Sequence, residues 1–157
     1  MTRQIRKSEL CHPRGAAPVG VLADLGSIEA AAVTLLRRWC DREREEILTE
    51  FEASLGAEGA KAVAAFQEIL SLCSQHGRRP LMRHDATCAC VGSDEAWFAN
   101  FIGAASEGAR EEALLIATVI VRADMAPLLA AYAEHVGLSL RRMALLRDRP
   151  ANQMKYH

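Results

Sequence analysis

Apolar residues along this chain recur every three or four positions, which is the period of an amphipathic α-helix. One stripe starts after Ser27, a residue suited to cap a helix, and runs to Trp39; past a charged turn it continues to Leu55. Further stripes follow, each bounded by glycine, proline or a capping residue. The pattern predicts helices over residues 27–55, 60–75, 93–105, 109–121, 124–136 and 139–147.

Composition supports a helical fold without a sheet. Half of the residues are hydrophobic, with many Ala and Leu among them, whereas aromatic residues make up only 5% and β-branched residues seldom cluster. We therefore expect an all-α protein: a single bundle of about six helices, with residues 77–92 as its long loop. Because the helix over residues 109–121 is apolar nearly all round after its first turn, we place it at the centre of the bundle.

A chain of 157 residues is long enough for one domain with a real core. Residues 1–26 hold several prolines and glycines with no helical period, so they are expected to form a flexible N-terminal arm. The helical domain is expected over residues 27–150, and residues 151–157 are a short tail.

Charge and hydropathy exclude some classes of partner and compartment. No apolar run is long enough to span a bilayer, so no membrane partner is expected. Basic residues near the N-terminus are followed by Glu9, His12 and Pro13 where the apolar part of a signal peptide would begin. We therefore expect a cytoplasmic protein with its five cysteines reduced. The net charge is −1, but residues 138–157 are rich in Arg and Lys, so an anionic partner would meet that end.

The loop and the helix before it concentrate soft metal ligands. The spacing C-x2-H-x7-H-x3-C-x-C places five thiols and imidazoles within eighteen residues, more than one tetrahedral Zn²⁺ needs. The candidate ligands are His84, Cys88, Cys90, Cys73 and His76, the first three being favoured. Cys73 also fits the apolar stripe of its helix as a core residue, and His76 also suits a helix C-terminus. Zinc is thus the possible cofactor.

The same loop permits an alternative function as a metal- or thiol-dependent enzyme. In the thiol version Cys88 is the nucleophile, His84 its base, and Asp85 or Asp94 orients the imidazole. No nucleophile motif surrounds Cys88, so this alternative rests on residue types alone.

The C-terminal segment, residues 129–148, reads LAAYAEHVGLSLRRMALLRD. Ala133 provides a small residue for close helix packing, and Gly137 a position for a turn. Apolar residues fill the remaining offsets at Tyr132, Val136, Leu138, Met143 and Leu146. Over these twenty residues the chain resembles the helix-turn-helix of bacterial transcription regulators, for example the arabinose-regulator type.

The resemblance implies a three-helix unit over residues 109–148 that binds DNA. Ser139 would cap the recognition helix, and Arg141 and Arg142 would face the groove. Leu140 and Leu145 on the same outward face instead suit a protein partner or a homo-oligomer formed through these helices. The sequence therefore predicts a small regulatory or interaction protein, with DNA as the leading partner; a helical oligomerisation or partner-binding module is a further alternative.

Overall fold

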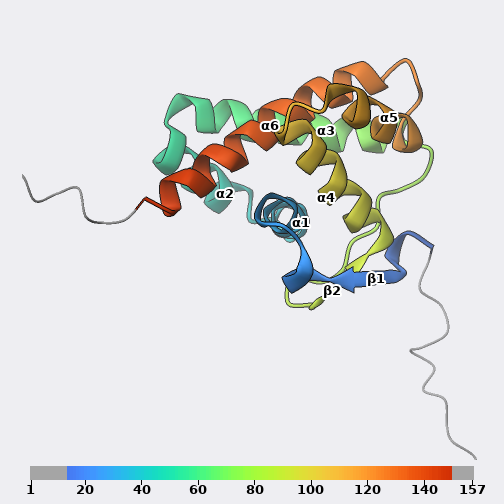
Figure 1. Cartoon of the computed structure of the whole chain (residues 1–157), viewed down its shortest axis with the longest axis horizontal. Coiled ribbons are helices and arrows are strands. Elements are labelled where there is room, and N and C mark those ends of the chain that lie inside the picture. The colour runs from blue at the N-terminus through green and yellow to red at the C-terminus, as the bar shows by residue number, and fades with distance from the viewer. Residues whose placement is uncertain (1–13, 150–157) are drawn as a thin grey trace, which may run out of the picture.

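The computed structural model describes residues 14–149 and contains six helices and a small two-stranded sheet (Figure 1). The helices are α1 (Ser27–Cys40), α2 (Arg44–Leu55), α3 (Ala57–His76), α4 (Ser93–Ser106), α5 (Arg110–Ile120) and α6 (Ala126–Arg147). The strands are β1 (Pro18–Val21) and β2 (Cys90–Gly92), and the 3-10 turns are η1 (Arg14–Ala16) and η2 (Leu22–Asp24). The predicted all-α bundle of six helices is confirmed, but the expectation of no sheet is wrong, because β1 pairs with β2.

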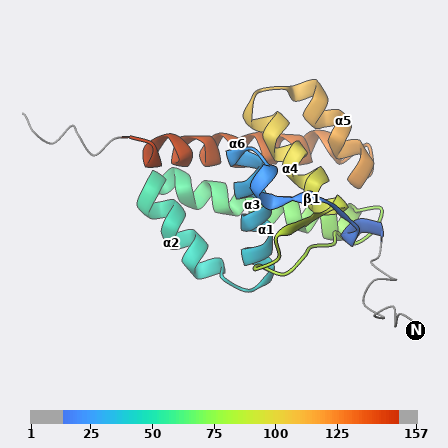
Figure 2. The same ribbon diagram turned by 60° about the horizontal axis from the view of Figure 1, so that its bottom comes forward.

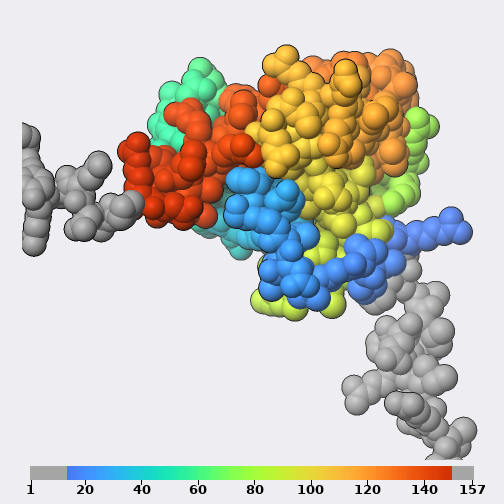
Figure 3. Space-filling model, viewed as in Figure 1, coloured from blue at the N-terminus to red at the C-terminus, as the bar shows by residue number. Residues whose placement is uncertain are grey.

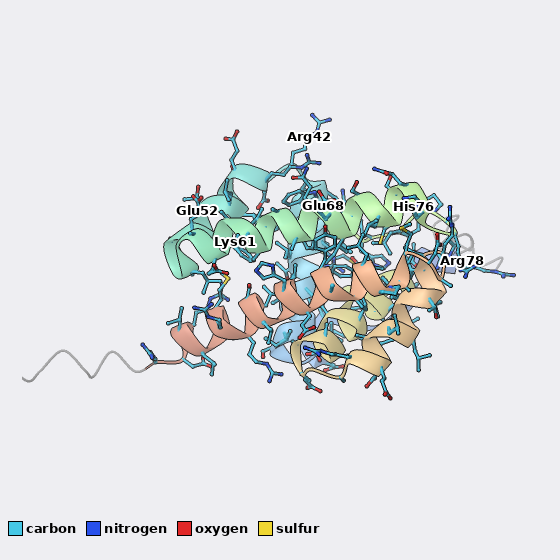
Figure 4. The ribbon with its side chains drawn as sticks, turned by 90° about the horizontal axis from the view of Figure 1, so that it is seen from above. Arg42, Glu52, Lys61, Glu68, His76 and Arg78 are labelled. Atoms are coloured by element: carbon cyan, nitrogen blue, oxygen red, sulfur yellow. The ribbon has the colours of Figure 1, made fainter. Side chains whose placement is uncertain are left out.

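The core lies where α3 and α6, which run side by side in opposite directions, meet α4 and α1 (Figure 4). Phe66 on α3 is its central aromatic residue. Its ring contacts Trp39 edge-on at 5.3 Å between centroids and Phe98 at 6.1 Å. These contacts join α1, α3 and α4, the three helices that surround the predicted loop.

The number of helices agrees with the prediction, but two boundaries differ. The first predicted helix is divided into α1 and α2 by residues 41–43, where Arg42 adopts a φ of 68°. The last two predicted helices are one, because α6 continues without a break through Gly137. The predicted turn at Gly137 is therefore wrong.

Gly137 serves helix packing rather than a turn. It is buried in α6, and a Cβ atom at this position would lie 2.9 Å from the Ile102 carbonyl oxygen and from the Ser106 backbone nitrogen, both on α4. The missing side chain thus lets α6 approach the backbone of α4 closely. A glycine between two apolar stripes is expected both at a turn and at a close contact between helices, which explains why the prediction of a turn was wrong.

Part of the expected N-terminal arm is ordered. β1 pairs antiparallel with β2, with Val21 opposite Cys90 and Gly20 opposite Val91. The Ser93 backbone N–H donates to the Ala17 carbonyl at 2.9 Å, extending the connection to the start of α4. Residues 1–13 of the arm and the whole tail of residues 151–157 lie outside the described part of the chain.

Helix α5 lies on the outside of the bundle, over α4 and the beginning of α6 (Figure 2). Its buried residues are Ala113, Ala117 and Ile120, whereas Leu115 and Val119 are 68% and 64% exposed. The predicted central position of this helix is wrong, because α3, α4 and α6 fill the centre. Within residues 14–149, no helix is long and apolar enough to cross a membrane.

Candidate functional site

A buried ion pair between α1 and α4 organises the end of the long loop. Arg37 and Glu95 are 1% and 0% exposed, and their side chains make two bonds: Arg37 Nε to Glu95 Oε1 at 2.7 Å and Nη2 to Oε2 at 2.9 Å. Burial opposes ionisation of Glu95, but hydrogen bonds from Arg37 and from two backbone N–H groups hold the pKa of Glu95 below its ordinary value. The pair is therefore charged, although it is buried.

The same two side chains bind the backbone on which the candidate thiols lie. Arg37 donates through Nη1 to the Cys88 carbonyl and through Nη2 to the Cys90 carbonyl, both at 2.7 Å. Glu95 accepts the backbone N–H of His84 at 3.0 Å and that of Gly92 at 2.9 Å. Four backbone groups of residues 84–92 are thus fixed from one buried point.

His84 and Cys88 form a thiol–imidazole pair on this fixed backbone. A turn closed by the Cys88 N–H donating to the Asp85 carbonyl at 3.0 Å brings the two side chains together. Cys88 Sγ lies 3.5 Å from His84 Nδ1, and His84 Nε2 lies 2.7 Å from the Ala16 carbonyl oxygen of η1. Because a carbonyl oxygen only accepts, Nε2 carries the proton, and Nδ1 of the neutral ring accepts from the thiol.

The electrostatics favour transfer of the thiol proton to the imidazole. The hydrogen bond to Ala16 and that to Cys88 raise the pKa of His84. The hydrogen bond with His84, the Cys90 backbone N–H and the positive charge of Arg37 lower the pKa of Cys88. Both shifts promote the thiolate–imidazolium form. Cys88 is only half-buried.

Neither predicted aspartate orients the imidazole; the Ala16 carbonyl does so. Asp94 is 2% exposed and forms an ion pair with Arg79, with Arg79 Nη1 at 2.6 Å from Oδ2. It also accepts the Met82 backbone N–H at 2.8 Å, so it holds the first part of the loop. Asp85 is exposed and contributes its carbonyl oxygen to the turn.

Of the five predicted metal ligands, the structure brings together His84 and Cys88. Cys73 faces the core at 5% exposure, and burial raises the pKa of its thiol to about 12. His76 ends α3, where its carbonyl oxygen accepts the Arg122 backbone N–H at 3.2 Å. Cys90 is half-buried on β2. In the part of the chain that the structure describes, no three His, Cys, Asp or Glu residues are grouped to hold a metal ion.

The helix-turn-helix unit is not formed either, because α6 has no turn. Ser139 is 4% exposed inside α6 and caps nothing, and Leu140, expected on the outward face, is 7% exposed. Arg141 and Arg142 are exposed, as predicted. They lie in the C-terminal half of α6, and Arg141 Nη2 lies 3.4 Å from Ser106 Oγ on α4.

Sequence reasoning missed Arg37, Glu95 and the Ala16 carbonyl. Arg37 lies next to Arg38 and resembles any other cation of a charged helix end. For Glu95 the local sequence did offer one indication, because a glutamate at the third position of a helix can accept the backbone N–H of the N-cap residue, here Gly92. Nothing local indicated that its partner is an arginine 58 residues earlier.

In comparisons with known proteins, the chain matches no family model, no curated protein and no solved structure. The function of the Cys88 site therefore has to be inferred from the chemistry of its own side chains.

Proposed function

We propose that this protein carries out thiol–disulfide exchange, with Cys88 as the nucleophile and His84 as its base. One observation carries the proposal: Cys88 Sγ lies 3.5 Å from His84 Nδ1 while the Nε2 proton of the same ring is held by the Ala16 carbonyl. This tautomer presents the basic nitrogen to the thiol, which is the arrangement that activates a cysteine.

The lowered pKa of Cys88 bears directly on reactivity, because the thiolate is the attacking species. An ordinary thiol with a pKa of about 8.5 is only about 3% thiolate at pH 7. A thiol that can pass its proton to a neighbouring imidazole and lies near the buried Arg37 has a larger thiolate fraction at that pH. Because the hydrogen bonds from Arg37 and to Glu95 fix the backbone of residues 84–92, the Cys88 thiol and the His84 imidazole already lie next to each other before a substrate binds. No further conformational entropy is lost in bringing them together.

The Cys88 proton moves to His84 Nδ1, and the thiolate attacks one sulfur of a substrate disulfide. The Cys88–sulfur bond forms, the substrate sulfur–sulfur bond breaks, and the departing thiolate takes the proton from His84. A second thiol in solution then attacks the mixed disulfide, restores the Cys88 thiol and leaves a new disulfide in solution.

The test is the rate at which each cysteine reacts. We would alkylate the whole chain with iodoacetamide from pH 5 to pH 10 and locate the adducts by peptide mass mapping, then repeat the reaction with oxidised glutathione. Cys88 should react first, with a rate profile whose midpoint lies below that of free glutathione. His84→Asn should move the midpoint upward and slow the reaction at pH 7 by about tenfold or more, the usual scale for losing a positioned base.

Cys90 provides the matched control. It is half-buried like Cys88, is two residues away, and its carbonyl is held by the same arginine. Cys90→Ser should leave the Cys88 profile unchanged. Equal rates for Cys88 and Cys90, or a Cys88 midpoint no lower than that of glutathione, would refute the proposal.

A further inference from the structure

The outer face of α5 carries apolar residues that the bundle does not cover. Leu115 and Val119 lie one helical turn apart, on the same side of the helix, and are 68% and 64% exposed. Leu114 beside them is 38% exposed. A helix that is apolar nearly all round is typical of a buried position, yet here the bundle covers only one side of it.

This apolar surface continues from α5 onto α6. A hollow of about 220 Å³ opens beside Leu114, and its walls include Ala113, Pro127, Ala130 and Ala131. The space-filling view shows α4, α5 and the beginning of α6 forming one continuous part of the surface (Figure 3). Large apolar side chains on α5 lie next to a shallow cavity that small residues line together with Arg110 and Glu134, a combination suited to close packing against another surface.

The two ends of α5 carry opposite charges. Glu111 and Glu112 lie exposed in its first turn, next to Arg110, which is 79% exposed and pairs with Glu134 on α6 at 3.1 Å. At its other end the Arg78 side chain (Figure 4) donates to the Thr118 carbonyl through Nε at 3.4 Å. Arg122 follows the helix in sequence, with 62% of its side chain exposed. Arg122 also pairs with the exposed Asp124 at 2.6 Å. The exposed stripe thus has a net negative charge at its first turn, is apolar at Leu115 and Val119, and has a net positive charge at its far end.

We infer that the outer face of α5 binds the same face of a second copy of this chain, related by a two-fold axis that crosses the helix between Leu115 and Val119. In this antiparallel contact Leu115 of one copy meets Val119 of the other. The acidic end of each α5 then meets the basic end of its partner, so the order of charges is self-complementary. A two-fold contact requires one patch that complements itself, and this stripe does so. The inference goes beyond the Cys88 chemistry and does not depend on it.

Sedimentation of the full chain over a range of concentrations tests the contact. The wild type should form dimers, and Leu115→Asp should weaken the dimer by about a hundredfold or more, because a carboxylate would be desolvated at the centre of the contact. Leu145→Asp is the matched control: Leu145 is a similarly exposed leucine, 64%, near the far end of α6. It should dimerise like the wild type.

Charge reversal provides a second test that does not introduce polarity into the apolar stripe. Glu111→Arg/Glu112→Arg makes both ends of α5 basic, and Arg78→Glu/Arg122→Glu makes both ends acidic. Each double variant alone should dimerise about tenfold or more weakly, because like charges would meet in both halves of the contact. An equimolar mixture should form a heterodimer at least as tight as the wild-type dimer, since every facing pair is again opposite in charge.

Three results would overturn the inference. The first is a wild type that stays monomeric up to its solubility limit. The second is a Leu115→Asp variant that remains folded by circular dichroism and dimerises as well as Leu145→Asp. The third is a mixture of the charge-reversed variants that shows no preference for the heterodimer, which would exclude this antiparallel pairing even if a dimer forms through another surface.

Discussion

Replacing Arg37 by Met should destabilise the protein far more than the same change at Arg38, its neighbour in α1. Arg37 is 1% exposed and donates four hydrogen bonds, two to Glu95 and one each to the carbonyls of Cys88 and Cys90. Without Arg37 the Glu95 carboxylate, 0% exposed, keeps only two backbone donors and no cation.

The expected magnitude follows from the burial of both partners. Removing one member of a buried ion pair costs about 3–5 kcal/mol, mainly because the other charge stays buried and uncompensated. This is a large part of the roughly 5–15 kcal/mol by which a domain is stable. It corresponds to a fall in Tm of roughly 6–20 °C for a chain of this size.

Arg38 is the control. It pairs with Glu50 at 2.7 Å, but the two side chains are 24% and 48% exposed. Water already solvates such a pair, so Arg38→Met should cost only about 0.2–1 kcal/mol. The two variants share helix, residue type and replacement, and differ in burial.

Urea unfolding of both variants measures the two costs. Arg37→Met/Glu95→Gln should recover part of the loss, because the uncompensated charge is gone, but not all of it, because the two loop carbonyls still lack their donor. The Arg37→Met change should also raise the pKa of the Cys88 thiol, which the nearby guanidinium lowers. Equal costs for Arg37→Met and Arg38→Met would show that the buried pair does not hold this loop.

Two further predictions concern α6 and the acid range. Gly137→Ala should lower the free energy of unfolding in urea by about 1–3 kcal/mol, because the new Cβ would lie 2.9 Å from the Ile102 carbonyl oxygen. This cost should exceed the gain of about 1 kcal/mol that alanine gives over glycine in a helix interior. A more stable variant would contradict the close α4–α6 approach. The stability advantage of the wild type over Glu95→Gln should be full above pH about 4.3, the unfolded pKa, and shrink as pH falls through the lower folded pKa of Glu95. A difference that stays constant from pH 6 to pH 3 would contradict this assignment.

The local pattern of the sequence determined which segments are helical and where the long loop lies. Apolar spacing identified the helices because the helix period is a local property, and glycine marked the ends of α2 and α3 because it interrupts that period. Residue types in the loop also indicated His84 and Cys88 as a candidate pair. Their four-residue separation lets a single turn join them.

Only the tertiary structure decided how these elements and side chains are used. Gly137 suits a turn or a close helix contact equally well, and the contact with α4 decides between them. The face of α5 that stays exposed depends on which helices occupy the centre of the bundle. The Cys88 site draws on Arg37 from α1, Glu95 from α4 and the Ala16 carbonyl from η1, which lie 51, 7 and 72 residues from Cys88 in the sequence. Local periodicity carries no information about such pairings, because they form only when packing excludes water and a buried charge then requires an opposite charge or a hydrogen-bond partner nearby.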